Sequence, residues 1–454
     1  MGKGANQQGN GELHSTPPAS KRFLGELTWE EVRKHDGKEV KDKWLVIDNQ
    51  VYDITRWSRR HPGGYKVITH YAGQDATEAF TAFHNDEAFV RKYMKAIHIG
   101  KLRDEEVEEK DIVKDMEELR KTAEKMGLFN ASFFFFFLQV FHILALEAAA
   151  YVIMRTYGFS WWTFIVCTSL IATLQAQCGW VQHDFGHLSC FKSTFWNHFF
   201  HYFLMSSIKG ASAKWWTHMH YQHHAKPNVI NKDPDVRLEK LFVVGEKMPI
   251  TVAESGESNM PFNHQHKYFF IIGPPLLFPV YFQFMIYRHM IKRREWVDLA
   301  FNVVYYIRFL YCYVPLMTWW QLLLFYETFR VLESIWFTWV SQSNHIPMEI
   351  DEDKARPWLA LQLHATCNLE KSWFNDWFTG HLNFQIEHHL FPTMPRHNLF
   401  RISPYVKSLC KKHNVEYKTK TLLEGFADII RSLKTSGQIW YDAYYHLQDQ
   451  YEEK

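Results

Sequence analysis

The sequence lacks several signals that would assign it to a common class of protein. Its six cysteines never form a CxxC pair, so their spacing indicates neither a zinc ribbon nor a disulfide framework. It also lacks an excess of one charge, because 51 Lys and Arg residues face 49 Asp and Glu residues, for a net charge of +2. A strongly basic nucleic-acid-binding protein and an acidic disordered chain are therefore excluded, and we expect no nucleic acid partner.

Aromatic residues, by contrast, make up 17% of the chain, a composition typical of proteins with aromatic belts at a membrane interface. Several runs carry almost no charge and are long enough to cross a hydrocarbon core of about 30 Å. A further run, at residues 334–348, has only 15 residues and is marginal for a span. The four longer runs are residues 131–154, 156–182, 268–287 and 309–326.

The N-terminal part contains the motif His-Pro-Gly-Gly at residues 61–64, with His84 following 23 residues after His61. A six-coordinate haem needs two opposed axial donors, and imidazole suits iron. This segment resembles cytochrome b5 over residues 23–102. The resemblance implies that His61 and His84 are the axial ligands of haem b, and that the domain carries electrons.

Histidines are concentrated in three groups farther along the chain. His183 and His187 are four residues apart, which places both imidazoles on one face of a helix. A second group at residues 220, 223 and 224 has spacings of three and four, and Gln385-Ile-Glu-His-His repeats that pattern with glutamine first. Seven imidazoles exceed the four positions of one zinc ion and suit two iron ions. Carboxylate-type di-iron bundles would instead show Glu-x-x-His pairs.

The three groups resemble the histidine boxes of membrane fatty acid desaturases. The fused haem domain and Gln385 are similar to the front-end group of the vertebrate delta-6 and delta-5 type. His345 and His381 are further candidate ligands outside the boxes, and whether they or Gln385 bind iron stays open. The ligands that the resemblance implies for two non-haem iron ions are His183, His187, His220, His223, His224, His388 and His389.

We therefore predict a multi-domain integral membrane protein. A small α+β cytochrome b5-like domain would precede a mainly α-helical membrane desaturase domain with four spans and a cytosolic helical cap. The predicted parts are a disordered arm (residues 1–22), the haem domain (23–102), a charged connecting helix (103–130) and the desaturase domain (131–454).

The ligands of one metal pair must lie on one side of the membrane, which constrains the topology. Two spans precede the first histidine box, so the haem domain lies on the same side as the box. An even number of spans must separate the second and third boxes, so we expect residues 334–348 not to cross. This arrangement places Arg288 and residues 292–294 on the opposite side, in conflict with the positive-inside rule.

The resemblance implies oxygen-dependent front-end desaturation of polyunsaturated fatty acyl-CoA in long-chain polyunsaturated fatty acid biosynthesis, with delta-6 favoured over delta-5 or delta-4. Electrons would come from NADH through NADH-cytochrome b5 reductase, because no glycine-rich dinucleotide fingerprint is evident here. We expect a multi-pass protein of the endoplasmic reticulum membrane with both soluble portions facing the cytosol. The alternatives are a fatty-acyl or sphingolipid hydroxylase with the same di-iron chemistry, and a membrane-anchored b5-type electron carrier.

Overall fold

The computed structural model describes residues 23–106, 110–256 and 260–452, so the predicted arm at residues 1–22 lies outside the described residues. The contacts divide the chain into two compact units. Unit 1 comprises Met1–Ser58, Tyr71–Thr77 and Asp86–Glu108. Unit 2 comprises Arg59–His70, Glu78–Asn85 and Glu109–Lys454.

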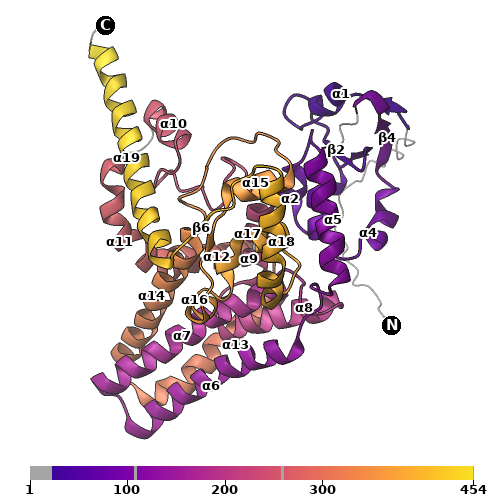
Figure 1. The fold of residues 1–454 in the computed structure, drawn as a ribbon. Helices are drawn as coiled ribbons and strands as arrows, with labels where there is room; N and C mark the ends of the chain where they lie inside the picture. The colour runs from indigo at the N-terminus through magenta and orange to yellow at the C-terminus, as the bar shows by residue number, and fades with distance from the viewer. Residues whose placement is uncertain (1–22, 107–109, 257–259, 453–454) are drawn as a thin grey trace, which may run out of the picture. The chain divides into compact units, whose positions relative to one another are not determined.

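Unit 1 is built on a four-stranded sheet with the strand order β1-β4-β3-β2 (Figure 1). Strands β2 and β3 form an antiparallel hairpin, with Trp44 paired to Asp53. The turn between them places Asp48 and Asn49 at positive φ, which these two residue types tolerate. The elements are β1 (Glu26–Leu27), α1 (Trp29–Lys34), β2 (Trp44–Ile47), β3 (Gln50–Asp53), α4 (Glu87–Met94), β4 (His98–Leu102) and η2 (Asp104–Glu106).

Short helices flank the two histidines that the sequence assigns to haem. Helix α3 (Thr77–Phe83) ends immediately before His84. The 3₁₀ turn η1 (Trp57–Arg60) and helix α2 (Tyr65–Thr69) lie on either side of His61. Farther along, α5 (Asp111–Lys125) is the charged helix expected between residues 103 and 130.

Most of unit 2 is helical, and its longest helices pack side by side, as α6 and α7 do in Figure 1. Helix α7 is the central one, because 72% of its apolar 18-residue stretch is buried, compared with 17% of the corresponding stretch of α6. Within the described residues, four helical runs are long and apolar enough to cross a membrane, in agreement with the predicted four-span fold. They are Phe133–Tyr157 (α6), Trp161–Gly186 (α7), Phe262–Arg293 (η4 to α12) and Trp296–Leu316 (α13 and η6).

The fourth predicted run, residues 309–326, was wrong in its boundaries. Helix α13 (Trp296–Tyr313) ends within it, and η6 (Val314–Leu316) carries a proline at the turn. Thr318 then begins α14 (Trp319–Ser343) with a capping box, in which its hydroxyl accepts a hydrogen bond from the Gln321 amide. The predicted run 309–326 therefore joins the end of α13 to the start of α14. Residues 334–348 are mostly the second half of α14, which ends at Ser343.

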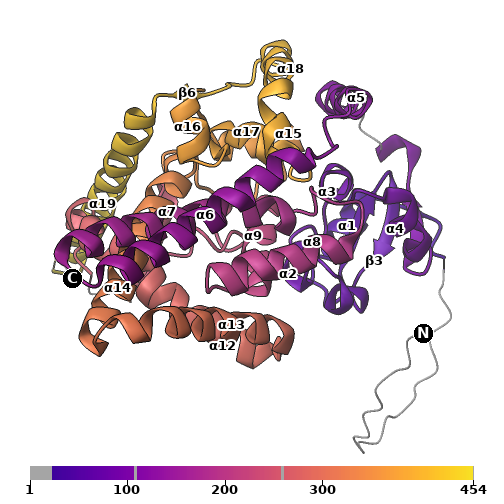
Figure 2. The same cartoon turned by 90° about the horizontal axis from the view of Figure 1, so that it is seen from below.

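The third helical run is interrupted. Helix α11 (Gln265–Leu276) contains Pro274 and Pro275 and continues into the π-helical segment η5 (Leu277–Phe282) and α12 (Gln283–Arg293). Ser334 of α14 satisfies two backbone groups at this break, because its hydroxyl donates a hydrogen bond to the Pro274 carbonyl and accepts one from the Phe278 amide. Figure 2 shows α12 lying beside α13.

The remaining elements include α9 and α17, which carry the second and third histidine boxes, and one small parallel sheet formed by β5 and β6. These elements are α8 (Thr194–His201), η3 (Tyr202–Ile208), α9 (Ala213–Ala225), α10 (Lys247–Ser255), η4 (Phe262–His264), α15 (Trp358–Ala365), β5 (Asn368–Leu369), α16 (Trp373–Phe378), η7 (Leu382–Phe384), α17 (Gln385–Leu390), η8 (Arg396–Asn398), α18 (Leu399–Lys412), β6 (Thr419–Lys420) and α19 (Leu422–Glu452).

Candidate functional site

The two histidines of the His-Pro-Gly-Gly segment and of the loop after α3 face one another. The ring centroids of His61 and His84 are 6.2 Å apart. Two metal–nitrogen bonds of about 2 Å account for about 4 Å of that separation, and half the width of each ring accounts for the rest. The pair therefore fits one iron ion between two axial imidazoles.

Backbone carbonyls close in sequence hold both rings. Nδ1 of His61 lies 3.3 Å from the Gly64 carbonyl oxygen, and Nδ1 of His84 lies 2.8 Å from that of Phe80. Burial, together with the neighbouring His84, lowers the pKa of His61 to about 4. The imidazole is therefore neutral at neutral pH, which is the state that binds iron.

The glycines of the motif are required by the fold around His61. A Cβ on Gly63 would lie 2.9 Å from Cε1 of His61, closer than real contacts allow. Gly64 has a φ of +105°, a conformation that residues with a Cβ rarely adopt. This segment consequently leaves room for the imidazole and turns the chain sharply beside it.

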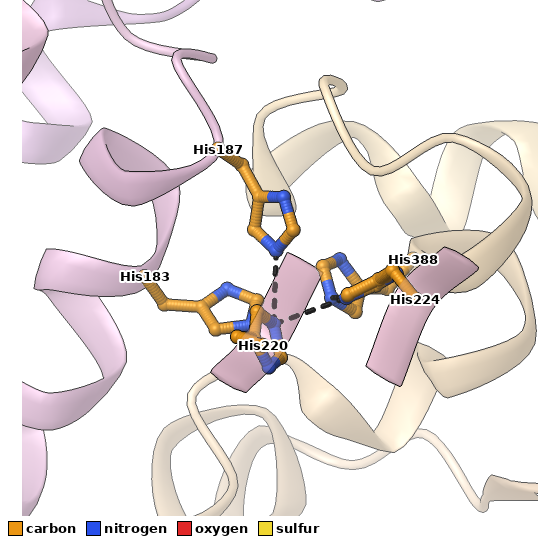
Figure 3. Close-up of side chains that lie close together, drawn as sticks. All are labelled: His183, His187, His220, His224 and His388. Atoms are coloured by element: carbon orange, nitrogen blue, oxygen red, sulfur yellow. Dashed lines mark hydrogen bonds between the residues drawn. The ribbon is translucent and has the colours of Figure 1, made fainter. Parts of the chain in front are cut away.

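In unit 2, five histidines form one group, which we call the five-histidine group: His183, His187, His220, His224 and His388. They come from the end of α7, from α9 and from α17, and one ligand atom of each lies within 4.8 Å of the others. Figure 3 shows their rings converging on one point. Helical spacing brings His220 and His224 to one face of α9, as the sequence predicts.

The ring nitrogens of this group face each other closely. Nε2 of His220 lies 3.0 Å from Nε2 of both His187 and His224, and Nε2 of His388 lies 2.9 Å from that of His224. Burial lowers the pKa of His187 to about 3. Neutral imidazoles that converge in this way are suited to a shared metal ion.

A second group, the three-histidine group, is formed by His223, His345 and His389. His223 lies on α9, His389 on α17, and His345 just after α14. The buried side chain of Gln385 joins them, with its Nε2 atom 2.8 Å from Nε2 of His345. Its Oε1 atom and Nε2 of His389 are buried without a hydrogen-bond partner, so donor atoms are available for a metal ion.

The two groups share elements, since α9 and α17 each contribute histidines to both. Rings from the two groups are in contact, because the centroids of His224 and His389 are 4.2 Å apart. Two adjacent sets of buried imidazoles fit a di-iron centre ligated mainly by histidine. The structure thus brings all seven box histidines, Gln385 and His345 together.

His381 is the one candidate ligand that belongs to neither group within the described residues. Its ring lies 5.7 Å from that of Phe135 in α6, and its Nδ1 atom is buried without a hydrogen-bond partner. The residue precedes η7 in a left-handed conformation, φ 65°. Although His381 is near the third box in the sequence, its side chain joins neither histidine group among the described residues.

Sequence reasoning missed the residues that hold the ligands. Asp233 lies 2.8 Å from Nδ1 of His223, and Gln362 presents Oε1 at 2.9 Å from Nδ1 of His389. Burial alone would lower the pKa of His223, but the charge and hydrogen bond of Asp233 raise it to about 9. An acidic residue shortly after the second box was the available signal for Asp233, whereas Gln362 had none.

Comparisons with known proteins agree with this geometry. Residues 28–103 match the family model described as "Cytochrome b5-like Heme/Steroid binding domain". Cytochrome b5 of Ostreococcus tauri virus 2, a solved structure, is 31% identical; the match covers 17% of this chain and 98% of that one, with a TM-score of 0.16.

Residues 159–421 match the family model described as "Fatty acid desaturase", a range that includes all three histidine boxes. The pair His61 and His84 lies in the cytochrome b5-like match, and both histidine groups lie in the desaturase match. Since the desaturase match covers more than half of the chain, the protein belongs to the fatty acid desaturase family and carries a fused cytochrome b5-like domain that binds haem.

Proposed function

We propose that the protein is a front-end desaturase that acts on polyunsaturated fatty acyl-CoA, with delta-6 as the first position to test and delta-5 and delta-4 next. The observation that carries the proposal is the three-histidine group, where Gln385 contacts His345 in the place of a box histidine. Together with the fused haem domain, this glutamine is the feature shared with the front-end group.

Membership of the family makes the protein an oxidoreductase that acts on fatty acids and receives electrons from the b5 domain. The irons, when bound, supply the activation of dioxygen needed to remove two hydrogens from adjacent methylenes, which no side chain can do. The chain itself holds the metal through buried imidazoles and keeps water from the reacting bond. We assign the ligand role to the box histidines, Gln385 and His345, and not to His381.

In this proposal His61 and His84 would hold the haem, and with two protein ligands the group would supply one-electron transfer and not binding of dioxygen. The upstream donor is NADH through NADH-cytochrome b5 reductase. We place the protein in the endoplasmic reticulum membrane with both soluble portions facing the cytosol.

Contacts at the helix ends support a specific topology. The ends of α7 and α14 carry histidines of the two groups, and Asp298 at the start of α13 accepts a hydrogen bond from the Ala213 amide that begins α9. The opposite ends also meet, because the ring of Phe325 in α14 lies 5.2 Å from Tyr313 in α13 and 6.3 Å from Phe164 in α7. We propose that α6, α7, α13 and α14 are the four spans. This assignment puts α14 in the place of the run Phe262–Arg293 and replaces the expectation that residues 334–348 do not cross.

Helix α14 has 25 residues, a length of about 37 Å, and carries Arg330 and Glu333 at its buried face. The two form an ion pair of 2.8 Å, and Glu333 also pairs with Lys209, which is 2% exposed. Charges inside a span face the protein interior and pair with one another. Their burial reconciles these two charges of α14 with a path through the bilayer, whereas Glu327 of the same helix is exposed.

In this topology, both ends of the interrupted run from α11 to α12 lie on the side of the membrane that holds the histidine groups. Near its start, Gln265 donates to the Leu433 carbonyl of α19 (2.7 Å), and near its end Arg293 lies 3.4 Å from His218 of α9. This arrangement moves the exposed cations Arg288, Lys292, Arg293 and Arg294 to the side of the histidines. The conflict with the positive-inside rule disappears.

Cysteine accessibility in sealed microsomes tests the topology. Lys292→Cys should react with a membrane-impermeant maleimide as readily as Lys411→Cys on α18, whereas Tyr157→Cys at the far end of α6 should react only after permeabilisation. Lys292 and Lys411 are both exposed, and Tyr157 is 69% exposed, so burial does not bias the comparison. A Lys292→Cys protein that needs permeabilisation would show that α11 to α12 crosses.

Expression in yeast supplied with defined polyunsaturated fatty acids tests the activity. A new double bond between the carboxyl end and an existing double bond, located by mass spectrometry, is the expected product. An alcohol in place of an alkene would assign the hydroxylase alternative. Haem iron without non-haem iron in the purified protein would assign the electron carrier.

A further inference from the structure

The three-histidine group is held by hydrogen-bond acceptors on the outer side of each ring. Nδ1 of His223 lies 2.8 Å from Asp233, Nδ1 of His389 lies 2.9 Å from Oε1 of Gln362, and Nδ1 of His345 lies 3.1 Å from the Ala365 carbonyl. A proton on Nδ1 leaves the lone pair on Nε2, the atom that faces the centre of the group. All three rings are therefore oriented before a metal ion arrives.

The five-histidine group is held differently. Its hydrogen bonds join the Nε2 atoms of its own members, and Nδ1 of His224 is buried without a partner. Nitrogens about 3 Å apart have the spacing of neighbouring ligands on one metal ion with bonds of about 2.1 Å. The two groups therefore differ in what supports their rings and not in how closely their nitrogens converge.

Asp233 differs from the other acceptors because it brings a charge. Its carboxylate is fully buried and accepts hydrogen bonds from the amides of Asn228 (2.7 Å) and Asp235 (2.8 Å). Its ion-pair partner in the described part of the chain is His223. A buried anion is costly unless a positive charge lies nearby, and a metal ion on the far nitrogen of His223 supplies that charge.

We propose that Asp233 makes the three-histidine group the tighter of the two metal positions, so that its metal enters first and leaves last. Asp233 is a positioning residue, because it acts through His223 and does not reach the reacting atoms. The inference concerns metal retention, so it stands or falls independently of which fatty acid is desaturated and at which bond.

Release of iron from the full-length protein tests the proposal. Protein in lipid nanodiscs, reloaded with Fe(II), is mixed with excess ferrous chelator, and the released iron is followed by absorbance. The wild-type chain should lose one iron quickly and one slowly. Asp233→Asn keeps the size and one acceptor oxygen but removes the charge, so the slow phase should accelerate 10- to 100-fold while the fast phase stays the same.

Asp298→Asn is the matched control. Asp298 is also fully buried and also accepts hydrogen bonds at one end of α9, from Ser206, Ser212 and the amides of Ala213 and Lys214, but among the described residues no histidine bonds to it. Its variant should leave the slow phase unchanged. An equal acceleration in both variants would mean that loosening α9 is the whole effect, and would overturn the proposal.

A second variant covers the case in which Asp233→Asn does not fold, which loss of detergent-soluble, monodisperse protein would reveal. Gln362→Leu removes the acceptor of His389 without removing a charge, so it should accelerate the slow phase in the same direction but by less. If both phases accelerate in a variant that folds, or if only the fast phase does, the assignment of the slow iron to the three-histidine group is overturned.

Discussion

The haem pair and the iron centre use the same side chain but support it over very different distances along the chain. His61 is held by the carbonyl three residues on, and His84 by the carbonyl four residues back. In the three-histidine group the acceptors lie 10, 20 and 27 residues from the rings that they hold. Haem ligation is thus built into local turns, whereas iron ligation depends on packing of the whole membrane domain.

The largest expected effect comes from removing a ring at the junction of the two histidine groups. His224 contacts His388 of its own group and stacks on His389 of the other, so His224→Ala should remove non-haem iron from the protein and abolish desaturation. The haem absorbance should remain, because its ligands are held locally. Iron analysis and a haem spectrum of one preparation make the measurement, and retained non-haem iron would contradict the assigned site.

The reverse experiment is His61→Ala, which should abolish the b5-like absorbance and leave non-haem iron bound. Desaturation should fail, because the path for electrons is cut. Recovery of turnover on adding free cytochrome b5 would make the fused domain replaceable. Turnover without any cytochrome b5 would contradict the proposed electron path.

A smaller effect tests local support directly. Gly63→Ala places a methyl group 2.9 Å from Cε1 of His61, so the ring has to shift and haem affinity should fall about tenfold. Haem transfer to apomyoglobin measures the loss. Non-haem iron should be unchanged, and a parallel loss of iron would show that the two centres are not independently supported.

The smallest expected effect concerns the position of the new double bond. Gln283 of α12 donates from Nε2 to the Tyr306 hydroxyl at 2.6 Å, while its Oε1 atom is buried without a partner. We expect this amide to face the path of the acyl chain, so Gln283→Leu should change the ratio of delta-6 to delta-5 products by on the order of 1 kcal/mol, roughly fivefold.

Tyr281→Leu is the control for that variant, because Tyr281 is 47% exposed on the same helical run. Its product ratio should match that of the wild-type protein. Unchanged regiochemistry in Gln283→Leu, with normal expression and normal iron content, would show that the position of the double bond is set elsewhere.

The same contrast explains how much could be predicted from the sequence. The His-Pro-Gly-Gly motif made His61 and His84 candidates from the sequence, and spacings within one helix did the same for the box histidines. His345 could only be a candidate, since its position depends on where α14 ends. Gln362 carries no pattern of its own, and Asp233 is marked only by its position after the second box. Hydropathy could not divide α13 from α14 because both sides of the turn are apolar.

The buried ion pairs of α14 have a consequence for biosynthesis. An arginine or a lysine at the centre of a helix opposes insertion from the translocon by about 2.5–3.5 kcal/mol. Arg330 is fully buried, and Glu333 reaches Lys209, which was synthesised earlier. In the proposed topology, α14 would leave the translocon favourably only when Lys209 of the earlier chain is already in place, so we expect membrane assembly to proceed from the N-terminus.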